Sequence, residues 1–179
     1  MAVREILRMG HPVLRQVARP LSEAERAAPA LRTLVDDMVE TLDAAGGIGL
    51  AAPQIGEPLR LAIIRFSGGP TRYGDLEPVP LTVYVNPVIE VADRHLQGFW
   101  EGCLSVPGLR GYVERPRGIR VRWLDLDGAE HEAAYDGFLA TVFQHEFDHL
   151  DGRLYIDRLT DTTRLSFESE LDRLLEDEG

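Results

Sequence analysis

The sequence predicts an α+β fold, with a helix towards each end of the chain and mixed or antiparallel strands around a central helix that carries His145-Glu146-Phe147-Asp148-His149. Two observations support this prediction. Apolar residues recur with a helical period in residues 31–42 and 138–149. Between them lie segments of strand-like composition, separated by Gly, Pro or Asp. Because strands and helices do not alternate, this order favours α+β over a doubly wound parallel sheet.

The N-terminal helix is predicted over residues 23–45. Ser22 can cap its first turn, and Gly46 with Gly47 can end it. The apolar positions that repeat close to the 3.6-residue period are Leu31, Leu34, Val35, Met38, Val39 and Leu42.

Five strands are predicted in the middle of the chain. Their segments are residues 59–66, 81–91, 99–105, 119–126 and 130–135. Asp127-Gly128, between the last two, is typical of a tight hairpin. Residues 67–75 are rich in turn formers and are expected to be a surface loop, and residues 164–178 are expected to form a polar C-terminal helix.

The composition is typical of a globular protein. Residues 1–179 are expected to form a single domain, because this length can bury about 70% of the unfolded surface. Hydrophobic residues make up 44% and charged residues 27%, which argues against disorder. The net charge of −11 argues against direct nucleic-acid binding, which requires surfaces rich in Lys and Arg.

The sequence favours a cytoplasmic location. Cys103 is the single cysteine, so no internal disulfide requires an oxidising compartment. The N-terminus has no continuous apolar segment of signal-peptide length, and no stretch approaches 18 apolar residues. Neither export nor membrane insertion is therefore expected.

The two histidines of the central helix have the spacing of metal ligands. Residues four apart share one face of a helix, so His145 and His149 can reach one ion. Glu146 follows the first ligand and can contact water without ligating the ion. The helix can start at Asp136-Gly137 and stop at Gly152, and Phe138 and Val142 share the side of the histidines. This arrangement places the histidines at the floor of a pocket.

Three options exist for the third ligand. A metzincin would have a third His where Tyr155 stands, so that option fails. Glu168 or Glu170 could complete a His₂Glu site, but both lie in a polar segment that is better explained as a solvated face. The remaining option is Cys103, which is preceded by a glycine that permits close backbone approach.

Three separated motifs resemble those of the peptide deformylase family. They occur in the expected order as Gly47-Ile48-Gly49-Leu50-Ala51-Ala52-Pro53-Gln54, Glu101-Gly102-Cys103-Leu104-Ser105 and Gln144-His145-Glu146-Phe147-Asp148-His149-Leu150. The resemblance covers nearly the whole chain and is weakest in residues 67–80 and after residue 160. It implies a metal-dependent hydrolase, one catalytic domain over residues 1–179, that removes the N-formyl group from the N-terminal Met of new proteins and releases formate.

The resemblance also implies roles for individual residues. Cys103, His145 and His149 would hold the metal, and Glu146 would act as general base and then as general acid. The side-chain amide of Gln54 and the backbone N–H of Leu104 would stabilise the oxyanion that develops on the formyl group. Gly49 would belong to the wall of the active site, where peptide lies extended against backbone.

A pocket for the Met side chain is implied as well. The residues at the matching positions are Ile48, Phe99, Phe138 and Val142, and each could equally belong to the core. Gly102 and Arg110 are candidate contacts of the peptide. Glu101 and Arg110 are expected either at the substrate entrance or behind the metal ligands. Thr141 is more polar than expected for this wall.

The resemblance implies one divalent ion, Fe²⁺ in the cell, with Zn²⁺, Ni²⁺ or Co²⁺ in preparations. The implied partner is the N-formyl-Met nascent peptide, with a transient association with the ribosome. Two rival hypotheses remain at this stage. One is a zinc endopeptidase with a Glu ligand, and the other is a binding module without catalysis.

Overall fold

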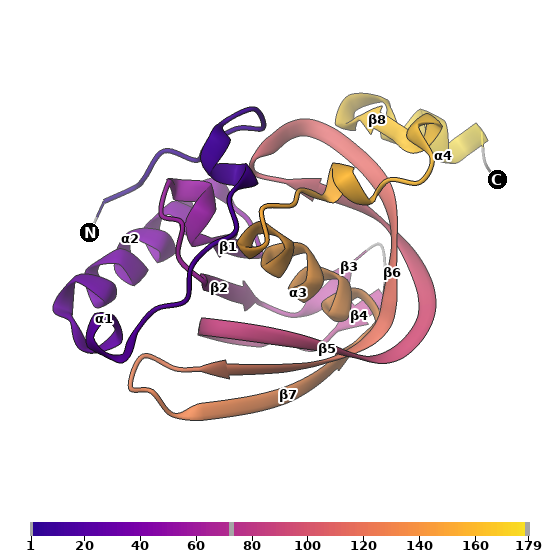
Figure 1. The fold of residues 1–179 in the computed structure, drawn as a ribbon. Coiled ribbons are helices and arrows are strands. Elements are labelled where there is room, and N and C mark those ends of the chain that lie inside the picture. Colours follow the sequence, from indigo (N-terminus) through magenta and orange to yellow (C-terminus); the bar gives the residue numbers. More distant parts are fainter. Residues whose placement is uncertain (1, 72–73, 178–179) are drawn as a thin grey trace.

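The computed structural model describes residues 2–71 and 74–177, in which a mostly antiparallel sheet is combined with several helices, as the sequence predicts (Figure 1). The main sheet has the order β1 (Gly49–Ala51), β2 (Leu61–Phe66), β5 (Val79–Cys103), β6 (Val106–Leu124) and β7 (Glu130–Asp136). β8 (Leu165–Phe167) also pairs with β6, and β3 (Gly69–Thr71) pairs with β4 (Gly74–Leu76). The α-helices are α1 (Glu23–Ala27), α2 (Pro29–Ala45), α3 (Gly137–Leu150) and α4 (Leu171–Asp177).

The predicted N-terminal helix is wrong in one respect, because the chain breaks it into α1 and α2. Ala28 separates them with an extended backbone, at φ −73° and ψ 135°. Pro29 explains the break, since its ring disfavours helical geometry in the residue before it while suiting the first turn of a helix. Gly46 ends α2 in the left-handed conformation, at φ 71°, as expected.

The strands β5 and β6 form one hairpin that is much longer than the sequence suggests. The predicted strand at 81–91 and residues 99–103 of the predicted strand at 99–105 are parts of the 25-residue β5, whereas residues 104 and 105 form the turn. β6 extends back from 119 to Val106. Residues 92–98 and 107–118 are rich in polar, Pro and Gly residues, which by local pattern predict turns. Backbone pairing across the hairpin tolerates them through several register shifts, and Figure 1 shows the hairpin curving past α3.

Two further segments differ from their predictions. The expected loop at 67–75 contains β3 and the start of β4, while residues 72 and 73 lie outside the described residues. The expected C-terminal helix at 164–178 is helical over Leu171–Asp177, after a strand and a short 3₁₀ turn, η5 (Glu168–Glu170); residue 178 is not described. Pairing of β8 with β6 overrides the local pattern there.

The strand β2 is buried on both faces between two helices. Leu61 and Ile63 pack into the apolar cluster that includes the inner side of α2, whereas Ala62 and Ile64 pack into the cluster of α3. Alternate residues of a strand point to opposite faces, which explains this division. The buried residues by which α3 enters the core are Ala140, Val142, Phe143, Phe147 and Leu150, of which Val142 also lines the cavity. The core thereby fixes α3 and leaves its other side free to line a cavity.

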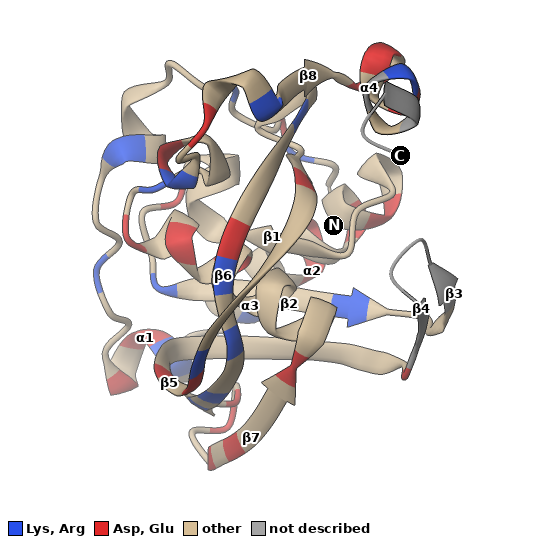
Figure 2. Ribbon diagram, turned by 90° about the vertical axis from the view of Figure 1, so that its right-hand side faces the viewer, with Lys and Arg blue, Asp and Glu red and all other residues tan. Residues whose placement is uncertain are grey.

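None of the described helices is long and apolar enough to cross a membrane. The excess of acidic residues is not gathered on one element, because Figure 2 shows Asp and Glu on α1, β7 and α4 alike.

Replacing Phe143 by Ala should destabilise the fold. The ring is fully buried, stacks on Tyr135 with 3.9 Å between ring centres, and meets Tyr84 edge-on. Truncating such a residue leaves a cavity, so the free energy of unfolding should fall by about 3–5 kcal/mol in urea titrations. Val17→Ala is the control, because Val17 is 72% exposed. Equal effects of the two substitutions would contradict this account of the core.

Candidate active site

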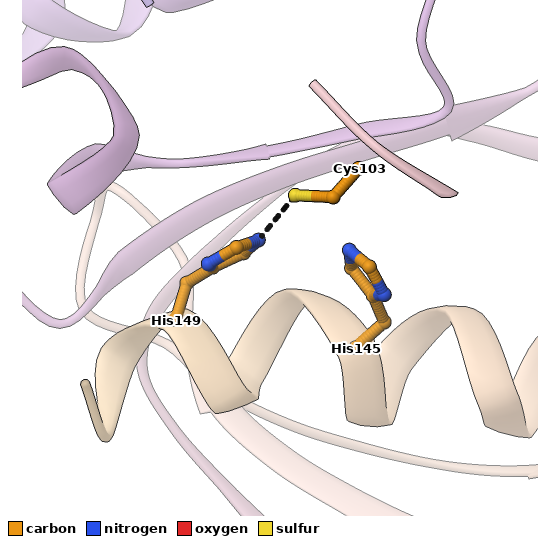
Figure 3. Close-up of side chains that lie close together, drawn as sticks. All are labelled: Cys103, His145 and His149. Carbon is orange, nitrogen blue, oxygen red and sulfur yellow. Dashed lines mark hydrogen bonds between the residues drawn. The ribbon is translucent and has the colours of Figure 1, made fainter. Parts of the chain in front are cut away.

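The end of β5 meets α3 at a cluster of three metal-ligating side chains. His145 and His149 rise from α3, and Cys103 approaches them from β5 (Figure 3). Their donor atoms all lie within 4.8 Å of one another, and Cys103 Sγ is 3.3 Å from His149 Nε2. Both histidines are buried and Cys103 is half-buried. The structure thus brings together the three residues that the sequence proposes as ligands.

The surroundings of Cys103 favour its thiolate. Burial by itself raises the pKa of the thiol, but the neighbouring His149 and His145 outweigh it and lower the pKa well below its ordinary value. Burial lowers the pKa of His145, whereas Cys103 and Glu101 raise it, and the net result is a raised pKa. Since the thiolate is the form of cysteine that binds metals, the cluster is prepared for a cation.

Glu101 orients the first histidine. Its Oε2 lies 2.7 Å from Nδ1 of His145, and both side chains are buried. Burial by itself raises the pKa of Glu101, but the hydrogen bonds from His145 and Arg115 have the larger effect. The net result is a lowered pKa, so the carboxylate is ionised. An ionised carboxylate only accepts, so the His145 ring donates through Nδ1, which leaves Nε2 as the nitrogen for a metal ion, whose binding would displace a proton held there.

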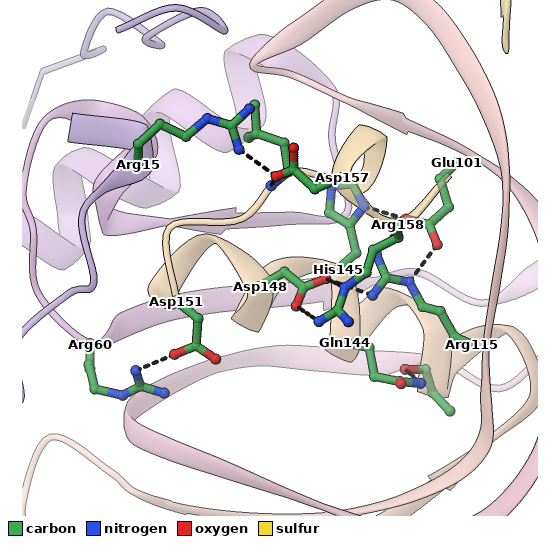
Figure 4. Close-up of polar contacts among 12 residues, drawn as sticks. Arg15, Arg60, Glu101, Arg115, Gln144, His145, Asp148, Asp151, Asp157 and Arg158 are labelled. Carbon is green, nitrogen blue, oxygen red and sulfur yellow. Dashed lines mark hydrogen bonds and ion pairs between the residues drawn. The ribbon is translucent and has the colours of Figure 1, made fainter. Parts of the chain in front are cut away.

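Behind Glu101 lies a buried ionic network (Figure 4). Arg115 donates from Nε to Glu101 Oε1 at 2.6 Å and from Nη1 to Asp148 Oδ2 at 2.7 Å. Asp148 also accepts from Nη2 of Arg158 at 2.6 Å. Burial raises the pKa of Asp148, but Arg158 and Arg115 outweigh it and lower the pKa. The sequence analysis missed this network, because the partners are far apart in the chain and no local pattern marks Arg115.

Glu146 occupies space that only a glycine at position 49 leaves open. The carboxyl group is buried, and its Oε2 has no hydrogen-bond partner among the described residues. Burial raises the pKa of Glu146. A Cβ atom on Gly49 would lie 2.5 Å from Cδ of Glu146. Gly49 therefore lies directly against the carboxyl group of Glu146, a contact that no local sequence pattern predicts.

Gln54 points its amide nitrogen at the cluster. It lies in the 3₁₀ turn η2 (Ala52–Ile55), and its Oε1 accepts from the backbone N–H of Ala51 at 2.9 Å. Its Nε2 consequently faces Ser105 Oγ at 3.2 Å and Cys103 Sγ at 3.7 Å. Leu104 lies in the turn between β5 and β6 and contributes to the same cavity. The buried Ser105 was missed as a partner of Gln54.

A cavity of about 560 Å³ opens over the cluster. Of the residues proposed from the sequence, its lining includes Ile48, Gly49, Gln54, Gly102, Cys103, Leu104, Arg110, Phe138, Val142, His145 and Glu146. Phe99 stands behind this lining, with its ring edge-on to Phe138 at 5.4 Å between centres. The volume suits a small ligand or a peptide side chain with its backbone.

The residues of the rival ligand sets lie near the site but are not among its three clustered donors, which are Cys103, His145 and His149. Tyr155 stacks on the ring of His145, with 6.0 Å between centres. Glu168 pairs with Arg110, and Glu170 pairs with Arg173 at 2.7 Å. Neither glutamate belongs to the cluster, so the arrangement does not support a His₂Glu site.

The cluster fits a divalent metal ion. Two imidazole nitrogens and one thiolate are the donors that bind zinc and iron, and three protein ligands leave a position open, as in catalytic sites. The unpartnered Glu146 Oε2 beside the donors also indicates that a polar occupant belongs there.

Known proteins resemble the chain over nearly its full length. The family model of polypeptide deformylase matches residues 3–165. A peptide deformylase of Leptospira biflexa serovar Patoc is 45% identical over 172 residues, 96% of each chain. Peptide deformylase 1 of Bordetella pertussis is 48% identical over 165 residues, 92% of each chain.

Solved structures agree. A class I type b peptide deformylase from Acinetobacter baumannii with Met-Ala-Ser bound has a TM-score of 0.81 at 34% identity and covers 88% of this chain and 99% of its own. The peptide deformylase of Thermotoga maritima has a TM-score of 0.77 at 35% identity, covering 90% of this chain and 100% of its own. The chain therefore belongs to the peptide deformylase family of metal-dependent hydrolases, which remove the N-formyl group from nascent peptides.

Proposed function

We propose that residues 1–179 form one catalytic domain, centred on the helix that carries His145 and His149, which hydrolyses the formyl group of N-formyl-Met peptides to formate and a free amine. The observation that carries the proposal is the convergence of Cys103 with both histidines beside the buried Glu146. The Acinetobacter baumannii relative with Met-Ala-Ser bound supports a substrate of this kind.

Cys103, His145 and His149 would hold the metal. When bound, the ion supplies Lewis-acid polarisation of a carbonyl group and lowers the pKa of water to about 7. We propose Fe²⁺ in the cell, with Zn²⁺, Ni²⁺ or Co²⁺ in preparations, because a site with nitrogen and sulfur donors accepts all four and metal supply decides among them.

Glu146 would carry the proton through the reaction. Its carboxylate accepts a proton from the attacking water and later donates it to the amine nitrogen that leaves as the C–N bond breaks. Burial supports this role, because it raises the pKa of Glu146 towards the range in which a carboxyl group both accepts and donates a proton. Because the carboxyl group of Glu146 is buried, solvent also screens its charge little.

Gln54 and Leu104 would stabilise the oxyanion. The Ala51 N–H holds Oε1 of Gln54, so that the amide cannot turn its acceptor towards the developing negative charge. Nε2 of Gln54 and the backbone N–H of Leu104 would then donate to the formyl oxygen. Such donors act without reorganisation because the fold positions them in advance.

The substrate would lie extended beside Gly49 and Gly102, with its Met side chain among Ile48, Phe138 and Val142 and with Phe99 supporting Phe138. Arg110 would contact the peptide at the entrance. Backbone pairing reads few side chains, which suits an enzyme that acts on many nascent chains. We propose that it acts in the cytoplasm, in transient association with the ribosome.

Two substitutions separate the base from the ligands. Glu146→Gln should bind metal normally and lose turnover, because the amide cannot accept the proton. Cys103→Ala should lose metal, because the two remaining histidines are too few ligands to hold the ion tightly. Metal content is measured by metal analysis of anaerobically purified protein. Turnover is measured as formate release from a formyl-Met peptide. Full activity and metal content in Cys103→Ala would refute the ligand assignment, and no formate from the metal-loaded wild type would refute the function.

Gly49→Ala should reduce turnover by about 10²-fold, because a methyl group at this position displaces the Glu146 carboxyl from its place. Gly47→Ala is a matched control. There the added Cβ lies closest to the ends of two leucine side chains, at 3.0 Å from Cδ1 of Leu104 and 3.1 Å from Cδ1 of Leu42, and not to the Glu146 carboxyl group. The measurement compares kcat with a formyl-Met peptide, and metal content, among Gly49→Ala, Gly47→Ala and the wild type. A Gly49→Ala enzyme with wild-type kcat would show that Glu146 does not depend on this space.

Arg115→Leu should destabilise the fold and loosen His145. It leaves Glu101 and Asp148 as buried carboxylates without their shared cation, which costs about 3–5 kcal/mol. The free energy of unfolding and the affinity for Zn²⁺ should both fall. Arg120→Leu is the control, since Arg120 pairs with Glu132 at the surface. If both variants unfold alike, the network does not have the proposed importance.

A further inference from the structure

The C-terminal segment returns to the mouth of the active-site cavity. β8 pairs antiparallel with β6 and lies beside the β5–β6 hairpin (Figure 1). Before it, the guanidinium of Arg164 lies 3.5 Å from the ring centre of Tyr112, and after it Leu171 is buried. These contacts anchor the segment on both sides. The position of Glu168 between them is therefore defined by the fold.

Glu168 forms an ion pair with Arg110 at this mouth. Nε of Arg110 donates to Oε1 of Glu168 at 3.0 Å, and Nη2 contacts the same oxygen. Both residues line the cavity. The guanidinium of Arg110 lies across Gly102, where any side chain would collide with it, and Gly102 is the neighbour of Cys103. The ion pair thus lines the cavity beside Gly102, next to Cys103 of the proposed ligand cluster.

The pair is accessible to a substrate. The side chains of Arg110 and Glu168 are 36% and 56% exposed, so an incoming charged group can exchange with either partner. An Arg110 without Glu168 would be a cation ready to bind a carboxylate in a bidentate manner. Glu168 lies beyond residues 3–165, so the family match assigns it no role.

We propose that Glu168 is a specificity-determining residue. It neutralises Arg110 and holds it against Gly102, so that an acidic side chain following the formyl-Met must compete with Glu168 for the guanidinium. The kcat/KM of the enzyme consequently differs little between acidic and basic peptides. This inference rests on the proposed function and extends it to the residues after the first.

The test compares kcat/KM for formyl-Met-Ala-Asp-amide and formyl-Met-Ala-Lys-amide. In Glu168→Gln the Asp-to-Lys ratio should rise about three- to fivefold at low salt, as expected when a partly exposed ion pair is lost, and the gain should shrink at high salt. Adding Arg110→Gln should abolish the gain. Glu170→Gln is the matched control, because it removes the same charge two residues along, from a pair with Arg173.

An unchanged ratio in both Glu168→Gln and Glu168→Ala would overturn the inference, as would an equal change in Glu170→Gln, which would indicate only the overall charge. Formate release by the wild type from formyl-Met-Ala-Ala reports separately on the proposed function. The affinities of Met-Ala-Asp-amide and Met-Ala-Lys-amide for the same proteins, measured by calorimetry, give the Asp-to-Lys ratio without turnover. The role of Glu168 is therefore tested even if the protein releases no formate.

Discussion

The buried carboxylate of Glu101 connects the sheet to the helix on which the site depends. It lies near the end of β5, two residues before Cys103, and it accepts hydrogen bonds from His145 of α3 and from Arg115 of β6. One side chain thereby joins β5, β6 and α3 beside the cluster of Cys103, His145 and His149, and it makes Nδ1 the donating nitrogen of the first ring.

A buried anion of this kind is costly, and the fold compensates for it with charge rather than with solvent. Arg115 lies between Glu101 and Asp148, and Arg158 completes the pairing of Asp148. Replacement of such a network by apolar residues often leaves stability unchanged, so its presence points to a function beyond stability. In this chain the network reaches the cluster through Glu101, whose carboxylate contacts Nδ1 of His145.

The chemical groups of the site rely on backbone as much as on side chains. Glu146 fits because Gly49 has no Cβ atom, and Gln54 presents its nitrogen because the Ala51 N–H holds its oxygen. Burial also raises the pKa of Glu146. The placement of the proposed base and the proposed donor thus comes from local geometry around Gly49 and Ala51.

The sequence by itself determined the elements whose signals are local. Spacing along a helix predicted that His145 and His149 share a face, a glycine pair marked the end of α2, and three motifs identified the family. Pro29 is also a local signal, which breaks the helix that the apolar period alone predicts. Cys103 was a candidate third ligand from the residues alone, whereas the role of Gln54 was predicted only through the resemblance, because no spacing relates it to the histidines.

Only the tertiary structure decided the contacts that depend on register. Pairing of β5 with β6 brings Arg115 to Glu101, 14 residues earlier, and packing of α3 against this hairpin brings Asp148 to Arg115 across 33 residues. Arg110 and Glu168 meet across 58 residues because β8 joins β6. A shift of one residue in either pairing would turn these side chains to the opposite face, and nothing in the local sequence encodes that choice.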